Sequence, residues 1–318
     1  MLRFMVTGGA GFIGSNLSET LLDKGHSVTV FDNLATGREE NLSGIMGRLD
    51  FIRGDIRDMA ALEAAMKGMD YVIHLAALGS VPRSIEDPAT THEVNATGTL
   101  NVLNAARAAK VKRVVCASSS SVYGDTAVLP KEEQMAPSPL SPYAVSKITG
   151  EYYCKAFHRV YGLETVALRY FNVYGRRQDP NSQYAAVIPR FVDAMLRGKS
   201  PVIYGDGEQS RDFTFVDDCN QANIKACFAG GAEGMHFNVG YGSKVSINDL
   251  FRKIRDSLGS TVEPTYAPPR KGDVRDSLAA ISRAREVLGY EPENGIDEGI
   301  RKTVRWYLES YGKLTGER

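Results

Sequence analysis

Short apolar runs and amphipathic runs alternate along the first half of the chain. The apolar runs predict buried strands, and they lie at residues 2–6, 27–31, 51–52, 71–75, 113–117 and 165–170. The amphipathic runs have apolar residues at helical spacing, and they predict helices at residues 15–24, 59–67, 97–110 and 143–161. Strands that alternate with helices in this way predict an α/β fold with a doubly wound parallel sheet.

The second half of the chain has a looser pattern. Beyond Tyr174 the alternation gives way to pieces separated by glycine and proline, such as residues 204–207 and 267–269. We expect residues 1–174, joined by some later segments, to form the domain that contains the sheet, and residues 175–318 to form mainly a smaller substrate-binding lobe. Ligands bind at the carboxyl ends of the strands in such sheets, which places the candidate loops at Gly8, Asp32, Asp55, Ala76 and Ser118.

Composition excludes several classes of partner. The 38 basic and 38 acidic residues balance, so no basic excess indicates a nucleic-acid or anionic-membrane surface. The four cysteines are scattered without metal-ligand spacing, as expected of reduced packing residues. The chain has no signal-peptide pattern and no apolar run of membrane-spanning length. We expect a cytoplasmic protein without a metal site.

A glycine-rich loop follows the first predicted strand. Gly8, Gly11 and Gly14 are spaced to allow a tight turn, the approach of a pyrophosphate and close packing of the next helix. Asp32 ends the second strand, where a carboxylate accepts ribose hydroxyls and repels a 2′-phosphate. These features predict a Rossmann-type domain that binds NAD in preference to NADP, although the nearby Arg38 would favour the phosphate.

Tyr143 and Lys147 lie one helical turn apart and therefore share a helix face. Ser141 is a suitable cap and Pro142 a suitable first residue for that helix, which places Tyr143 near the positive end of its dipole. A free phenol titrates near pH 10, so a tyrosine base needs a lowered pKa, to which Lys147 and a bound oxidised nicotinamide would contribute. Ser119 follows a strand, where its hydroxyl could bond the reacting group. A polar turn is the ordinary alternative for the serine run at residues 118–121.

The chain resembles an extended short-chain dehydrogenase/reductase of the sugar-nucleotide epimerase/dehydratase family over almost its whole length. The resemblance rests on the segments at residues 7–14, 54–56, 74–77, 118–121 and 169–175, together with Asp32, Tyr143 and Lys147. It implies NAD contacts at Gly8, Gly11, Phe12, Ile13, Gly14, Asp32, Asn33, Asp55, Ile56, Leu75, Ala76, Ala77, Asn95, Tyr143, Lys147 and Tyr170. His74 lies in an apolar strand and is expected to be a core histidine.

The resemblance also bears on the type of reaction and on the substrate. Dehydratases of the family carry an Asp-Glu pair where this chain has Ser120 and Ser121, and serines cannot do that acid and base work. Epimerisation at carbon 4 remains. Family members restricted to plain hexoses have a bulky residue at the position that matches Ser277. Members that admit an N-acetyl group have a small residue there. Segments at residues 79–84, 175–181, 184–189 and 272–275 resemble bacterial UDP-N-acetylglucosamine 4-epimerases most closely.

The resemblance also implies a sugar-nucleotide site in the second lobe. Its expected residues are Gly79, Ser80, Arg83, Ser119, Ser120, Asn172, Gln178, Ala186, Val187, Tyr204, Arg211, Arg275 and Ser277. Arg211 and Arg275 would clamp the diphosphate, for which surface salt bridges are the alternative. For Asn172, Val187 and Tyr204 the alternative is core packing.

The sequence therefore predicts an NAD-dependent 4-epimerase that interconverts UDP-N-acetylglucosamine and UDP-N-acetylgalactosamine through a 4-keto intermediate, and also UDP-glucose and UDP-galactose. A UDP-glucose or UDP-glucuronate 4-epimerase is the related alternative, and a non-catalytic NAD-binding regulator is the alternative from another class. The resemblance implies a homodimer through a four-helix bundle of the helices at residues 97–110 and 143–161. Burial of their apolar stripes against their own sheet is the alternative.

Overall fold

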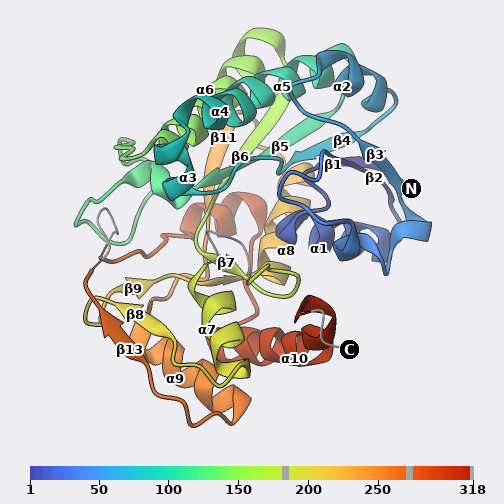
Figure 1. The fold of residues 1–318 in the computed structure, drawn as a ribbon. Coiled ribbons are helices and arrows are strands. Elements are labelled where there is room, and N and C mark those ends of the chain that lie inside the picture. Colours follow the sequence, from blue (N-terminus) through green and yellow to red (C-terminus); the bar gives the residue numbers. More distant parts are fainter. Residues whose placement is uncertain (181–185, 270–274, 316–318) are drawn as a thin grey trace.

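Seven parallel strands form the central sheet, in the order β11-β6-β5-β4-β1-β2-β3 (Figure 1). The computed structural model describes residues 1–180, 186–269 and 275–315 of the chain. The strands are β1 (Arg3–Thr7), β2 (Ser27–Asp32), β3 (Asp50–Arg53), β4 (Tyr71–His74), β5 (Arg113–Ser119), β6 (Glu164–Tyr170) and β11 (Met235–Val239). The strand order reverses direction between β1 and β4, which opens a crevice at the carboxyl ends of these strands. The predicted doubly wound parallel sheet is confirmed.

Helices cover both faces of the sheet. One face packs against α1 (Phe12–Asp23) and α8 (Val216–Phe228), through a core that includes Leu17, Val30 and Ala222. The other face packs against α2 (Met59–Ala65), α5 (Gly98–Ala108) and α6 (Pro142–Tyr161). The apolar stripes of these helices are buried in both layers, as their helical spacing predicts.

Two short helices precede α5 and were not predicted. They are α3 (Val81–Glu86) and α4 (Pro88–His92), and a π-helical turn, η3 (Glu93–Thr97), joins α4 to α5. The hydroxyl of Ser80 accepts a hydrogen bond from the Arg83 backbone N–H at 3.2 Å and so caps α3. Asp87 caps α4 in the same way, at 3.0 Å from the Thr90 nitrogen. Each cap precedes a proline-containing first turn, so the local signals are present in the sequence.

A smaller lobe lies below the sheet in Figure 1. Its helices are α7 (Val187–Leu196), α9 (Ile247–Leu258) and α10 (Ile296–Thr315). Three two-stranded sheets pair β7 (Val173–Tyr174) with β10 (Thr214–Phe215), β8 (Val202–Tyr204) with β13 (Thr265–Ala267), and β9 (Ser210–Arg211) with β12 (Val245–Ser246). The lobe has its own core, which includes Phe191, Phe251 and Val304. Between its parts the chain returns to the large sheet as α8 and β11, so the lobe consists of separated segments.

Short helical turns complete the described structure: η1 (Glu39–Leu42), η2 (Met46–Arg48), η4 (Ser120–Tyr123) and η5 (Ala284–Leu288). All four cysteines are buried free thiols. No helix in the described ranges combines the length and the apolar character that a membrane crossing requires.

Candidate functional site

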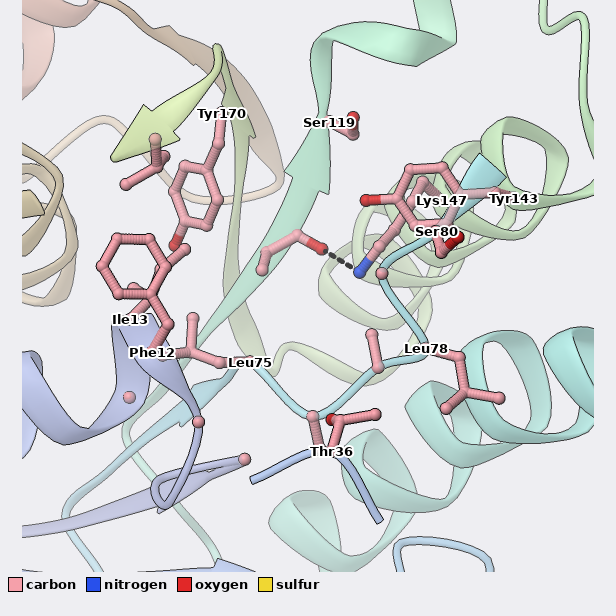
Figure 2. Close-up of a pocket in the computed structure, with 18 of the residues that line it drawn as sticks. Phe12, Ile13, Thr36, Leu75, Leu78, Ser80, Ser119, Tyr143, Lys147 and Tyr170 are labelled. Atoms are coloured by element: carbon pink, nitrogen blue, oxygen red, sulfur yellow. Dashed lines mark hydrogen bonds between the residues drawn. The ribbon is translucent and has the colours of Figure 1, made fainter. Parts of the chain in front are cut away.

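A cavity of about 1330 Å³ extends from the carboxyl ends of the strands to the small lobe. The loops after β1, β2, β4 and β5 form its wall on the side of the sheet, and α6 adds Tyr143 and Lys147. The lobe contributes Arg211 and Ser277. Figure 2 shows Tyr143 and Lys147 on one side of this space and Phe12, Ile13 and Tyr170 on the other. The crevice expected from the strand order is therefore the main candidate site.

The glycine loop is built for the close approach of a backbone or a ligand. A Cβ on Gly14 would lie 2.3 Å from the carbonyl oxygen of Gly8, and a Cβ on Gly8 would lie 2.6 Å from the Ala76 nitrogen. Gly8 also has a positive φ of 72°. Helix α1 begins without a side-chain cap and without an acidic residue in its first turn, so its N-terminal N–H groups remain available to an anion. This cradle fits the pyrophosphate of a dinucleotide.

Asp32 lies at the end of β2 with only 7% of its surface exposed. Its carboxylate accepts hydrogen bonds from the backbone N–H groups of Ala10 and Leu34, at 2.9 and 2.8 Å. Burial raises its pKa, and these two bonds oppose the rise. Arg38 forms an ion pair with Asp179 at 2.6 Å. The arginine that would favour a 2′-phosphate is therefore held by a carboxylate, which leaves the preference for NAD in place.

The adenine end of the predicted cofactor site differs in detail from the expectation. Ile56 and Asn33 line the cavity, but Asp55 does not. The Asp55 carboxylate accepts hydrogen bonds from the side chains of Arg57 and Asn33, which hold its pKa well below the usual range. Asp55 thus orders the loop around the cavity, and its predicted contact with the cofactor remains a prediction.

The predicted catalytic pair, Tyr143 and Lys147, lies in the first turns of α6 and lines the cavity. The Ser141 hydroxyl caps α6 by accepting the Ala144 N–H at 3.2 Å, and Pro142 is its first residue. The Lys147 ammonium donates to the carbonyl oxygen of Ala117 at 3.1 Å, as Figure 2 shows, and lies 5.9 Å from the centre of the Tyr143 ring. One cationic and one phenolic group therefore face the same part of the cavity.

The protein alone does not lower the pKa of Tyr143. Burial raises the pKa of this phenol above its ordinary value of 10, and the neighbouring Ser119 hydroxyl opposes the rise only in part. Burial also lowers the pKa of Lys147 to about 8. The expected contribution from Lys147 is thus smaller than the cost of desolvation. A further positive charge in the cavity would favour the phenolate form of Tyr143.

Four consecutive serines, Ser118 to Ser121, form the end of β5 and the start of η4. Ser119 Oγ lies 2.9 Å from Ser121 Oγ and 3.2 Å from the Ser121 backbone N–H. The N–H must donate, so one acceptor position of the Ser119 hydroxyl is already used. Ser118 also lines the cavity, but its hydroxyl donates to the buried carboxylate of Glu151. Ser119, Ser120 and Ser121 complete this part of the wall.

Asn95 is buried outside the cavity wall and links two of the segments that form the wall. Its side chain accepts the Leu78 N–H at 2.8 Å, donates to the Leu78 carbonyl oxygen at 3.2 Å and donates to Ser146 Oγ at 3.0 Å. Asn95 is not in the cavity wall and instead ties the loop after β4 to α6. His74 is a core histidine, as expected: it is bonded to Thr7 and Thr99, and burial lowers its pKa to about 3.

The structure brings most of the predicted sugar-nucleotide residues into one wall. These are Gly79, Ser80, Arg83, Ser119, Ser120, Asn172, Gln178, Ala186, Arg211 and Ser277. Asn172 has a positive φ of 31°, and its amide donates to the Asp212 carbonyl oxygen at 2.9 Å. Arg211 donates to the backbone oxygens of Ser210 and Arg275, each at 2.9 Å. Long-range pairing of loop segments thus assembles this wall.

Three predicted substrate residues lie outside the wall. Val187 packs at the edge of the lobe core, as the core-packing alternative proposed. Tyr204 ends β8, where its carbonyl oxygen accepts a hydrogen bond from Gln209 at 2.6 Å. The Arg275 side chain is 70% exposed and lies 3.6 Å from Asp206, the surface salt bridge of the alternative interpretation. Their predicted contacts with a substrate remain predictions.

The sequence reasoning missed several wall residues, among them Lys131, Asp179 and Asp276. No local motif marks them, because pairing between distant segments brings them to the cavity. Asn181, Tyr184, Ala185 and residues 272–274, which support the resemblance, lie outside the described residues. Within the described ranges, no cluster of histidine, cysteine and acidic residues could hold a metal ion.

Comparison with known proteins finds similarity over nearly the whole chain. A model of the NAD dependent epimerase/dehydratase family matches residues 4–240. The UDP-glucose 4-epimerase of Mycolicibacterium smegmatis is 42% identical over 96% of this chain and 98% of its own length. A UDP-N-acetylglucosamine 4-epimerase from Methanobrevibacter ruminantium M1, solved in complex with UDP-N-acetylmuramic acid, has a TM-score of 0.93 and 44% identity, covering 97% of this chain and 99% of that one. The UDP-glucose 4-epimerase of Thermus thermophilus, solved with NAD, has a TM-score of 0.89 and 39% identity, covering 96% and 99%.

These similarities agree with the geometry of the cavity. The glycine cradle, Asp32 and the Tyr143–Lys147 pair occupy one continuous wall, as the resemblance requires. The cofactor of the matched family is NAD, and the cradle of this chain fits that group. The chain belongs to the NAD-dependent epimerase/dehydratase family.

Proposed function

We propose that this chain, an NAD-dependent UDP-sugar 4-epimerase, interconverts UDP-N-acetylglucosamine and UDP-N-acetylgalactosamine. The observation that carries the choice of substrate is Ser277, a small side chain in the wall of the same cavity as Tyr143 and Ser119. A small residue leaves room for a 2-acetamido group. The similarity to the M. ruminantium UDP-N-acetylglucosamine 4-epimerase supports the same choice.

Tyr143 acts as the base that removes the proton from the 4-hydroxyl of the sugar. Ser119 positions that hydroxyl, because its own oxygen is already bonded to the Ser121 N–H and its proton can be donated. The Lys147 ammonium favours the phenolate form of Tyr143. NAD, held by the glycine cradle and Asp32, would supply hydride-transfer chemistry at carbon 4 when bound.

The resulting 4-keto sugar must turn its other face to the cofactor without leaving the protein. The lobe would hold the nucleotide during this turn, with Arg211 bonded to the diphosphate oxygens. Binding energy placed in the nucleotide leaves the hexose free to rotate. The protonated Tyr143 returns its proton to the 4-oxygen, and the product has the opposite configuration at that carbon.

Two related substrates remain alternatives. UDP-glucose is compatible with the wall, because Ser277 admits the acetamido group without excluding a hydroxyl, and the M. smegmatis relative is named for that substrate. A UDP-glucuronate enzyme would need a basic group near carbon 6. Arg176 is engaged by Glu19 and Asp217, at 3.4 and 3.0 Å, and is not in the wall. Arg83 lines the cavity and keeps this alternative open.

A homodimer is part of the proposal. Helix α6 has large apolar side chains on its exposed face, among them Val145, Tyr152 and Val160. A second copy of the chain would cover this face by packing α5 and α6 against their counterparts as a four-helix bundle. Sedimentation should give a dimer mass, and Tyr152→Glu together with Val160→Glu should shift it to a monomer. A monomeric wild-type protein would contradict this part of the proposal.

The test of the proposed function is an NMR time course of purified protein. UDP-N-acetylglucosamine, UDP-glucose and UDP-glucuronate are incubated in parallel without added NAD, and again with it. The largest kcat/KM should be for the acetamido sugar, with its galacto epimer as product. A preference for either other sugar would keep the reaction and replace the substrate. No conversion of any sugar in the presence of NAD would support the non-catalytic regulator.

A further inference from the structure

Lys131 is a buried cationic residue in the cavity wall to which the reaction assigns no role. It is only 3% exposed, and it lines the cavity together with Gly124, Asp276 and Ser277. Lysine is rarely buried unless its charge is used, because removing an ammonium from water is costly. Burial lowers the pKa of Lys131, as this cost predicts.

The backbone of Lys131 is joined to the segment that carries Ser277. The Lys131 N–H donates to the Leu278 carbonyl oxygen at 2.7 Å, and its own carbonyl oxygen accepts the Ala280 N–H at 2.9 Å. These two bonds form a parallel bridge between Lys131 and Ala279. The bridge therefore places Lys131 beside the segment that carries Ser277, and both residues line the cavity.

The hydrogen bonding of the Lys131 ammonium is incomplete in the described part of the chain. Its Nζ donates to the carbonyl oxygen of Thr126, and no other acceptor for it is found among the described residues. An ammonium has three protons to donate. Two donors therefore remain for a group in the cavity beside Ser277.

We propose that Lys131 donates a hydrogen bond to the carbonyl oxygen of the 2-acetamido group of the substrate. The inference rests on the proposed function, in which Ser277 leaves room for that group. Ser277 only permits the acetamido group, whereas a charged donor beside it selects for the group. A neutral carbonyl is the better match than a carboxylate, because the Asp276 carboxylate lies in the same wall and would repel an anion.

The test compares Lys131→Met with wild type on two substrates that differ only at carbon 2. Methionine keeps the length and apolar stem of lysine and removes the donor. Losing a hydrogen bond from a charged donor should reduce kcat/KM for UDP-N-acetylglucosamine by about 10- to 100-fold. The value for UDP-glucose should change by less than about threefold, because a 2-hydroxyl lacks the distant carbonyl oxygen. The ratio of the two effects measures the coupling between Lys131 and the acetamido group.

Two further variants control for folding and for charge. Lys199→Met removes an exposed lysine outside the cavity wall and should leave kcat/KM unchanged for both substrates. Lys131→Gln keeps a donor without the charge and should recover part of the loss. Bound NAD and the unfolding temperature, measured for every variant, show whether the protein remains intact.

Each outcome separates this inference from the proposed function. A wild-type protein that epimerises UDP-glucose but not UDP-N-acetylglucosamine would overturn the proposed function first. The next case is a wild type that epimerises both UDP-glucose and UDP-N-acetylglucosamine. If Lys131→Met then reduces kcat/KM for the two sugars equally, Lys131 is a structural residue and the inference is wrong. If Lys131→Met mainly abolishes turnover of UDP-glucuronate, the partner of Lys131 is a carboxylate, and the inference is again wrong.

Discussion

The two ends of the cavity are built in different ways. At the cofactor end, the cradle consists of backbone atoms of the glycine loop and the carboxylate of Asp32, all within the first 32 residues and held by β1, α1 and β2. At the sugar-nucleotide end, the wall combines segments as distant as Lys131, Asn172, Arg211 and Ser277. The cofactor end therefore depends on space and close approach, and the other end depends on long-range pairing. Changes at the first should affect every substrate equally, and changes at the second should discriminate between substrates.

The largest effect is expected from Tyr143→Phe, at the junction of the two ends. Removing the proposed proton acceptor should lower kcat by about 10³-fold for every UDP-sugar that turns over. Bound NAD and the unfolding temperature should stay close to wild type, because the ring remains in place. Stopped-flow and NMR assays measure the rate. Retention of more than a tenth of the activity would mean that another group takes the proton.

A second large effect is expected from Gly14→Ala at the cofactor end. The added Cβ would lie 2.3 Å from the Gly8 carbonyl oxygen, so the cradle must shift. Overpacking of this kind costs about 1–3 kcal/mol, which predicts a loss of NAD affinity of about 10- to 100-fold. Gly44→Ala is the matched control, because nothing lies within 4 Å of its added Cβ. Calorimetry with NAD distinguishes them, and equal affinities would show that the cradle is not the binding site.

Ser277→Tyr tests the sugar-nucleotide end of the cavity. A bulky ring should close the space beside Lys131, so kcat/KM for UDP-N-acetylglucosamine should fall by about 50-fold relative to UDP-glucose, within the range that one-sided pockets provide. NAD affinity should not change. Competition assays with both substrates measure the ratio directly. An unchanged ratio would place the acetamido group elsewhere in the cavity.

Lys147→Met tests how much the buried Lys147 ammonium destabilises the folded protein. The folded-state pKa of Lys147 is about 8 against an ordinary value of 10.5, so the unfolded chain binds more protons between these values and wild-type stability gains from rising pH in that window. Below pH 8 the buried ammonium is a cost, and the Lys147→Met protein should be more stable at pH 7 by roughly 1–3 kcal/mol. Urea unfolding at pH 7 and pH 9.5 checks this. The advantage should shrink at the higher pH, and an advantage independent of pH would refute the explanation.

The smallest effect is expected from Arg275→Ala. Its guanidinium is 70% exposed and meets Asp206 only at 3.6 Å, so the loss of this pair should be nearly neutral. The KM for UDP-N-acetylglucosamine should change by less than about threefold. Arg211→Ala, inside the wall, should raise the same KM by at least about tenfold. Equal effects of the two variants would support the predicted contact of Arg275 with the diphosphate.

The sequence predicted the cofactor end more closely than the substrate end, for a physical reason. The glycine loop, Asp32 and the cap at Ser141 work through neighbouring residues, so their spacing alone carries the signal. Strand β11 and the placement of Lys131 depend on pairing with residues far along the chain, which no local pattern reports. The pKa of Tyr143 could not be foreseen either, because its direction depends on burial by the complete fold.

The most direct test follows a deuterium label on carbon 4 of UDP-N-acetylglucosamine. If Tyr143 and bound NAD act as proposed, NMR and mass spectrometry of the product will show UDP-N-acetylgalactosamine with the deuterium still on carbon 4 and none in the solvent. The hydrogen leaves that carbon as a hydride and returns to it within one protein. Loss of the label to water during epimerisation, or no epimer at all in the presence of NAD, would contradict the mechanism.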